Sequence, residues 1–286
     1  MNDPASVQRV LYWVARKAGL VPAGDNANLD PDMATEILIF MDDRLREAWD
    51  TYNFVETTMC DERSFRDDFD ATKCYEKGAI VWDPCTRAYY SALLTETGGP
   101  LNNASVWAPA PSVSPRWVPW KQTNRLTIGT CFGAWTSNPY ETTNRRRLWF
   151  EVSRRGLEFT NCPETATAWL VYRVPYPGIG LAEWDATLTY SVGDTVYDAP
   201  DSWYSLIDGN KGKDPATSPD AWVSFRVPYP MVRFVQQAAY SDTLITAGQN
   251  EKAPNELQMA YGFLGQAFDQ QQLQQGQREN WTGYSG

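Results

Sequence analysis

Apolar side chains near the N-terminus recur at three- and four-residue steps, the spacing of one face of a helix. The first set predicts a helix that ends where Gly19 can cap it, and it consists of Val7, Val10, Leu11, Val14 and Ala18. A second set follows Asp30 and Pro31, a pair typical of a helix start, and it consists of Ile37, Phe40, Met41, Leu45 and Ala48. Together the two sets predict a helical hairpin.

The helical spacing returns after Pro230 and predicts a helix that ends near Gly248. A last helix is expected over residues 254–275, with a glutamine-rich end. That end has two interpretations: the polar face of an ordinary helix, or a surface that packs against identical neighbours in a ring. In the second case the packing residues are Leu257, Leu264, Gln270, Gln271, Gln274 and Gln275.

Between the helical ends, a five-residue pattern occurs twice with a constant offset of 115 positions. The first copy is Tyr75, Gly78, Val81, Tyr89 and Trp107, and the second is Tyr190, Gly193, Val196, Tyr204 and Trp222. A constant offset predicts a duplicated module, here a small β module rich in aromatic residues. Strand-like runs outside the copies, at 126–132, 147–152 and 168–174, predict a separate β platform.

We therefore expect an α+β fold in which N- and C-terminal helices form a bundle, with a central β platform and two small inserted β modules. The expected boundaries are 1–72 and 228–277 for the helical core, 73–115 for the first module, 116–177 for the platform, 178–227 for the second module and 278–286 for a C-terminal tail. Arg-Val-Pro-Tyr-Pro occurs at 173–177 and again at 226–230. The chain is thus expected to leave the platform and return to it through the same five residues, although a local duplication without structural meaning is the alternative.

The chain contains no histidine, which excludes Ser-His-Asp and Cys-His catalysis and histidine metal sites. Its five cysteines are odd in number and lack Cys-x-x-Cys spacing, so we expect free thiols, no structural zinc and no other metal or cofactor. The N-terminus lacks a signal-peptide pattern and no apolar run is long enough for a bilayer, so no membrane contact is expected. Adjacent acid pairs such as Asp67 and Asp68 suit a glycosidase poorly, because neighbours on a strand point to opposite faces.

The net charge of −10 is unevenly distributed. Residues 1–70 hold 15 acidic and 7 basic side chains, residues 71–177 hold 7 and 12, and residues 178–286 hold 13 and 6. Acidic surfaces disfavour duplex DNA binding and suit a surface past which DNA moves, although acid also simply keeps proteins soluble. The one basic cluster is predicted to receive an acidic neighbouring subunit, with a solvated hairpin as the alternative, and it consists of Arg145, Arg146, Arg147, Arg154 and Arg155.

The second module resembles the chitin-binding type 3 modules of chitinases over about 40 residues. The resemblance lies in a Tyr-x-x-Gly-Asp-x-Val pattern at residues 190–196, the Trp203-Tyr204-Ser205 run, Pro215 and Trp222. It implies binding of a glycan, or of a protein surface, by exposed aromatic rings. The candidate rings are Trp184, Trp203, Tyr204 and Trp222, with Tyr89 and Trp107 in the first copy, and their alternative role is core packing.

The element order and both chain ends resemble head-to-tail adaptors of tailed bacteriophages. The resemblance is carried by Val-Pro-Tyr-Pro-Met231 leading into an alanine-rich helix, and by the closing segment from Gln272 to Arg278. It implies a structural virion protein without enzymatic activity, made in the host cytoplasm and placed in the neck. It further implies a ring, commonly of twelve copies, that joins the portal to a tail tube or nozzle protein and lets genomic DNA pass. The competing class is a carbohydrate-binding adhesin or a tail-associated protein that binds the host surface.

Overall fold

The chain has a mixed α+β fold with four α-helices and several small antiparallel sheets in the described part. The computed structural model describes residues 4–22, 29–97, 99–110, 113, 115–122, 125–141, 145–161 and 166–282, without the side chains of 96–97 and 274–282. The helices are α1 (Val7–Lys17), α2 (Pro31–Thr51), α3 (Tyr229–Thr246) and α4 (Ala253–Thr282), and a short 3-10 turn covers Val55–Thr57. Cys162 and the last four residues of the predicted tail lie outside this part.

The starts and ends of the first two helices follow the sequence signals. The Asp30 side chain accepts hydrogen bonds from the backbone N–H groups of Asp32 and Met33, with Pro31 as the first residue of α2. Gly19 follows α1 with a φ of 75°, a left-handed conformation that glycine adopts without strain. The predicted caps at both positions are confirmed.

Seventeen short strands form six antiparallel sheets among the described residues. The sheet orders are β1-β12-β8-β9, β10-β11-β7, β2-β5, β3-β4-β6, β13-β16 and β14-β15-β17. The strands are β1 (Thr58–Ser64), β2 (Cys74–Tyr75), β3 (Ile80–Asp83), β4 (Ala88–Ala92), β5 (Glu96–Thr97), β6 (Trp107–Pro109), β7 (Trp117–Pro119), β8 (Thr130–Trp135), β9 (Arg147–Leu148), β10 (Phe150–Val152), β11 (Gly156–Phe159), β12 (Thr167–Arg173), β13 (Thr189–Tyr190), β14 (Thr195–Asp198), β15 (Asp201–Ser205), β16 (Asn210–Lys211) and β17 (Trp222–Phe225).

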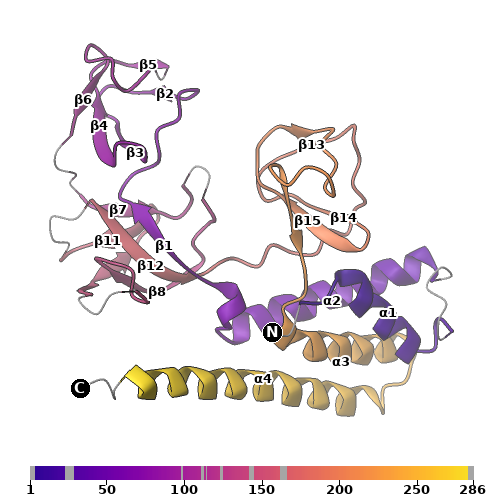
Figure 1. Cartoon of the computed structure of the whole chain (residues 1–286). Coiled ribbons are helices and arrows are strands. Elements are labelled where there is room, and N and C mark those ends of the chain that lie inside the picture. The colour runs from indigo at the N-terminus through magenta and orange to yellow at the C-terminus, as the bar shows by residue number, and fades with distance from the viewer. Residues whose placement is uncertain are drawn as a thin grey trace. The chain divides into compact units, whose positions relative to one another are not determined.

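The chain divides into two compact units, which we call the helical unit and the sheet unit. The helical unit comprises Met1–Glu56 and Tyr176–Gly286, and the sheet unit comprises Thr57–Pro175. The sheet unit holds β1 to β12, whereas the helical unit holds the four helices together with β13 to β17 (Figure 1). Each unit has its own clusters of buried residues.

In the helical unit, α3 packs against α1, α2 and α4. Figure 1 shows α4 running beside α3. The Lys17 ammonium group links three helices, because it donates to Gln237 on α3 at 2.8 Å and lies 3.4 Å from Glu256 on α4. The far part of α4 packs through Phe268 against Tyr52, with ring centroids 4.6 Å apart.

In the sheet unit, β1 and β12 pair over their whole lengths, from Thr58 opposite Arg173 to Ser64 opposite Thr167. The sequence pattern assigns residues up to 72 to the helical core. In the structure, the polar residues Thr58–Ser64 of that range form β1, a strand of the sheet unit. Local apolar periodicity does not reveal such a strand, because its partner lies about a hundred residues away in the sequence.

The repeated Arg-Val-Pro-Tyr-Pro segments also differ from the expectation. The first copy leaves β12, but the second leads into α3 rather than back to a strand of the platform. Tyr176 of the first copy is half-buried and donates a hydrogen bond to Asp42 at 2.8 Å, whereas Tyr229 of the second copy is exposed. The two copies therefore share a sequence but not a structural role.

Arg63 is a fully buried cation in the sheet unit. Its Nε donates to Asp61 at 3.0 Å, and its Nη2 donates to the Leu126 carbonyl oxygen at 2.7 Å and to the hydroxyl group of Tyr172. Such a network holds β1, β12 and the segment before β8 together, since each buried donor needs a partner.

We predict that Arg63→Ala lowers the free energy of unfolding of the sheet unit by about 3 kcal/mol or more, because it leaves buried acceptors without their cation. The control is Arg87→Ala, which removes the exposed ion pair to Glu62 and is expected to change little. Amide hydrogen exchange of the β1 and β12 residues measures both effects. Equal exchange in the two variants would contradict this assignment.

Candidate interaction surfaces

The two β modules share a hydrogen-bonded core geometry, which extends over residues 67–109 and 182–225. Tyr75 accepts a hydrogen bond from the Asp70 backbone N–H at 2.8 Å, and Tyr190 accepts one from the Asp185 N–H at 2.9 Å. The parallel bridges Asp68 to Trp82 and Glu183 to Tyr197 also correspond at the same offset. The sequence repeat therefore corresponds to a repeated structure.

One position of the repeat is not structurally equivalent. Trp82 lies opposite Tyr89 in the first module, and its counterpart Tyr197 lies opposite Ser202 in the second. The counterpart of Tyr89 is therefore Ser202 rather than Tyr204, because the turn between the two strands is shorter in the second copy. The match of Tyr89 with Tyr204 in the sequence pattern is a coincidence of loop lengths.

This position anchors each module within its own unit. The Phe65 backbone N–H donates to the Tyr89 hydroxyl group at 2.7 Å, and the Gly180 N–H donates to Ser202 Oγ at the same distance. Phe65 and Tyr89 belong to the main core of the sheet unit. In the second module the same contact is made by two small residues, and its turn bonds to α1 through the Gln8 N–H and the Pro200 carbonyl oxygen at 3.1 Å.

We predict that Gly180→Ala destabilises the second module by about 1–3 kcal/mol, because a Cβ there would lie 2.1 Å from the backbone carbon of Val196. The control is Gly262→Ala on α4, where nothing lies within 4 Å of an added Cβ. Thermal unfolding with hydrogen exchange at β14 and β15 measures the difference. If Gly180→Ala behaves like the control, the close approach is absent in solution.

The aromatic residues proposed for glycan binding are mainly packing residues. Trp222 and Trp107 are 1% and 2% exposed, and Tyr89 is buried. Each tryptophan makes an edge-on contact with the first tyrosine of its module, Tyr190 and Tyr75, with ring centroids 5.2 and 5.4 Å apart. A buried ring cannot stack on a sugar. Trp107 and Trp222 therefore serve the module cores, and Tyr89 serves the main core of the sheet unit.

Trp184, Trp203 and Tyr204 are half-buried and are the remaining candidates of that group. Trp184 and Trp203 pack against the core of the second module. The Trp203 Nε1–H donates to the Asp198 carbonyl oxygen at 3.1 Å, and Trp184 Nε1 is buried without a partner among the described residues. Within the described part of both modules, no aromatic side chain is exposed enough to stack its ring face on a sugar.

On α4, the residues proposed for ring packing serve different roles. Leu264 is buried and Leu257 is half-buried, facing the helix's own unit. Gln271 bonds to the chain after α2, accepting from the Val55 N–H and donating to the Asn53 carbonyl oxygen, both at 3.3 Å. Gln270 is exposed, and the side chains of Gln274 and Gln275 lie outside the described part. Leu264 and Gln271 thus hold α4 within one chain.

We predict that Leu264→Ala costs about 2–5 kcal/mol of unfolding free energy, because it leaves a cavity beneath α4. Leu273→Ala is the matched control, since Leu273 is exposed on the same helix. Urea unfolding monitored by circular dichroism compares the two variants. Similar midpoints would mean that α4 does not pack against its own unit.

The five arginines of the basic cluster are exposed, and so are two apolar residues close to them in sequence, Trp149 and Val152. We call this set of residues the basic corner: Arg145, Arg146, Arg147, Trp149, Val152, Arg154 and Arg155. Trp149 and Val152 are 63% and 72% exposed, at the edge strands β9 and β10. Sequence patterning missed Trp149, although its place after the buried Leu148 was a signal, since neighbouring strand residues face opposite sides.

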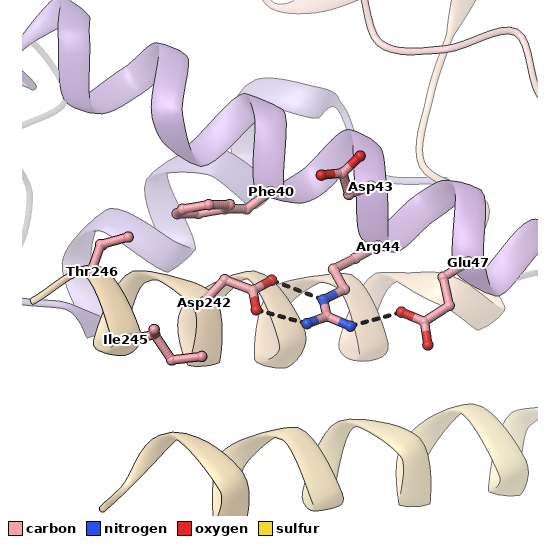
Figure 2. A pocket seen from close by; sticks show the side chains of 7 residues that line it. All are labelled: Phe40, Asp43, Arg44, Glu47, Asp242, Ile245 and Thr246. Atoms are coloured by element: carbon pink, nitrogen blue, oxygen red, sulfur yellow. Dashed lines mark hydrogen bonds and ion pairs between the residues drawn. The ribbon is translucent and has the colours of Figure 1, made fainter. Parts of the chain in front are cut away.

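A second surface lies on the helical unit between α2 and α3, and we call it the acidic hollow (Figure 2). Its volume is about 300 Å³, and its lining consists of Phe40, Asp43, Arg44, Glu47, Asp242, Ile245 and Thr246. Arg44 donates to both Asp242 oxygens at 2.8 and 2.7 Å and to Glu47 at 2.7 Å. The hydrogen bond to Asp242 raises the pKa of Arg44 above its usual value, against the opposing effect of desolvation, so the guanidinium group stays charged.

Two of the four described cysteines are poor nucleophiles at neutral pH. Burial raises the pKa of the Cys60 thiol to about 11 and that of Cys131 to about 12, so neither is a thiolate at neutral pH. The four cysteines in the described part form no disulfide. In that part no group of three or more Cys, Asp or Glu residues could hold a metal ion, and no helix is both long and apolar enough to cross a bilayer.

Comparisons with protein-family models, with curated proteins and with solved structures found no match for this chain. The basic corner and the acidic hollow are therefore assigned from their own geometry and charge.

Proposed function

We propose that this chain is a structural component of a tailed-phage neck, a ring-forming head-to-tail adaptor that joins the portal to the tail. The proposal rests on the resemblance of both chain ends and of the element order to such adaptors. In this role the helices form the bundle that meets the portal and surrounds the DNA channel, and the β platform and the two modules lie outside it. The tail-side partner is a tail tube or nozzle protein.

The observation that best supports an assembly role is the separation of charge between the two units. The helical unit holds 23 acidic and 11 basic residues, whereas the sheet unit holds 12 and 14. An acidic helical unit repels the DNA backbone and so suits a channel wall that must not bind the passing genome. A weakly basic sheet unit offers a complementary surface for neighbouring acidic protein.

The burial of the module aromatics supports the same proposal. Trp107 and Trp222 are core residues, and their edge-on contacts with Tyr75 and Tyr190 hold each module together. Trp203 and Tyr204 are half-buried rather than fully buried, and this keeps a carbohydrate-binding adhesin as the second candidate function. In the adaptor role both modules are scaffolds for protein contacts.

We predict that the purified full-length chain binds the portal ring of its own phage in a fixed ratio, measured by native mass spectrometry, while the chain alone forms no stable ring. Glycan-array binding is expected to be absent for the wild-type chain and for Trp203→Ala alike. The adhesin function replaces the adaptor function if the wild-type chain binds a glycan, Trp203→Ala abolishes that binding, and the chain does not bind the portal. A stable ring without portal contradicts templated assembly.

A further inference from the structure

The basic corner has the composition of a binding hot spot. Trp149 projects from the edge of the sheet unit, while its backbone is fixed by the Asn161 side chain, which accepts from the Trp149 N–H at 2.6 Å. The Arg147 guanidinium group lies 5.7 Å from the Trp149 ring centroid. Tryptophan and arginine are among the residues most enriched at interface hot spots, where a large side chain fills a desolvated pocket of the partner.

The acidic hollow has the complementary composition. Phe40 and Ile245 supply apolar surface, and Ile245 is 51% exposed. Three carboxylates line the hollow, Asp43, Glu47 and Asp242. Arg44 is the one cation in the lining, so the lining carries a net negative charge. Asp43 is exposed and has no ion pair among the described residues, so an arginine from outside can reach it.

We propose that the basic corner of one copy docks in the acidic hollow of the next copy, with Trp149 against Phe40 and Ile245 and with Arg147 near Asp43. The proposal rests on the adaptor function, and it names the contact between neighbouring subunits. The charges favour a second copy as the occupant. Its arginines would contact the carboxylates of the hollow, and this contact would not bring the acidic helical units of the two copies together.

This contact is heterologous, because it joins two different surfaces of identical chains. Such head-to-tail contacts close into rings when the rotation per subunit permits, and otherwise form open filaments. The corner also carries Glu151, paired opposite Glu158 across β10 and β11, but the arginines outnumber these acids. The expected affinity is modest, since a single ring and a few rim charges form a small interface.

The test is sedimentation velocity on full-length chains over a range of concentrations up to about 1 mM, a range in which weak contacts are populated. The wild-type chain is expected to associate as concentration rises. Trp149→Ala and Ile245→Arg are each expected to weaken association about tenfold or more. Tyr229→Ala is the control, because Tyr229 is exposed at the start of α3 and belongs to neither the basic corner nor the lining of the acidic hollow, and it is expected to associate like the wild type.

A mixing experiment then tests whether the two surfaces meet each other. The Trp149→Ala chain keeps an intact hollow and the Ile245→Arg chain keeps an intact corner, so an equal mixture is expected to form dimers and nothing larger. Likewise, Arg147→Glu and Asp43→Arg are each expected to weaken association, and the double variant is expected to restore it. Both substituted positions are exposed, and circular dichroism checks that each variant is folded.

A wild-type chain that stays monomeric at about 1 mM overturns the proposed contact, and so does a mixture of the two variants that forms no dimer. Neither result bears on the adaptor function, because portal binding is measured in a separate experiment. Conversely, if the mixed variants form dimers but the wild-type chain does not bind the portal, the proposed contact between copies is retained and the adaptor function is rejected.

Discussion

The pairing of β1 with β12 determines how this chain is organised. Because Thr58 lies opposite Arg173, the sheet unit begins and ends at neighbouring positions, and the Val174 N–H donates to the Thr57 carbonyl oxygen at 3.1 Å. The chain between these points folds as a separate unit, and the helices before and after it pack together. The buried Arg63 network lies on the same strand pair, so one set of contacts both closes the sheet unit and stabilises it.

The duplicated module shows how one scaffold serves two settings. The tyrosine and tryptophan that pack edge-on within each copy are the same, but the anchoring pair is Phe65 with Tyr89 in one copy and Gly180 with Ser202 in the other. Large residues suit the broad core of the sheet unit, whereas the small pair lets Gly180 approach the backbone of Val196. The aromatic pattern is thus explained by packing within the chain. The exposed charged and apolar side chains proposed for binding lie in the basic corner and the acidic hollow.

The helices could be predicted because their signals are local: apolar spacing, the Asp30 cap and Gly19. The modules could be predicted because duplication repeats the core residues. The polar strand β1 and the burial of Arg63 could not, since both depend on partners distant in sequence. Trp149 was missed because its exposure follows from strand alternation only once the burial of Leu148 is known. The acidic hollow could not be predicted because it joins α2 to α3 across 198 positions between Arg44 and Asp242.

The central claim is that this chain works by assembly through its charged surfaces, with its aromatic modules as scaffolds. The most direct measurement is an electron cryo-microscopy map of the phage neck. We expect a closed ring of this chain between portal and tail, in which the Trp149 corner of each copy contacts the α2–α3 surface of the next. A neck without this chain, or a map that places it at the tail surface with its modules on host glycan, would contradict the account.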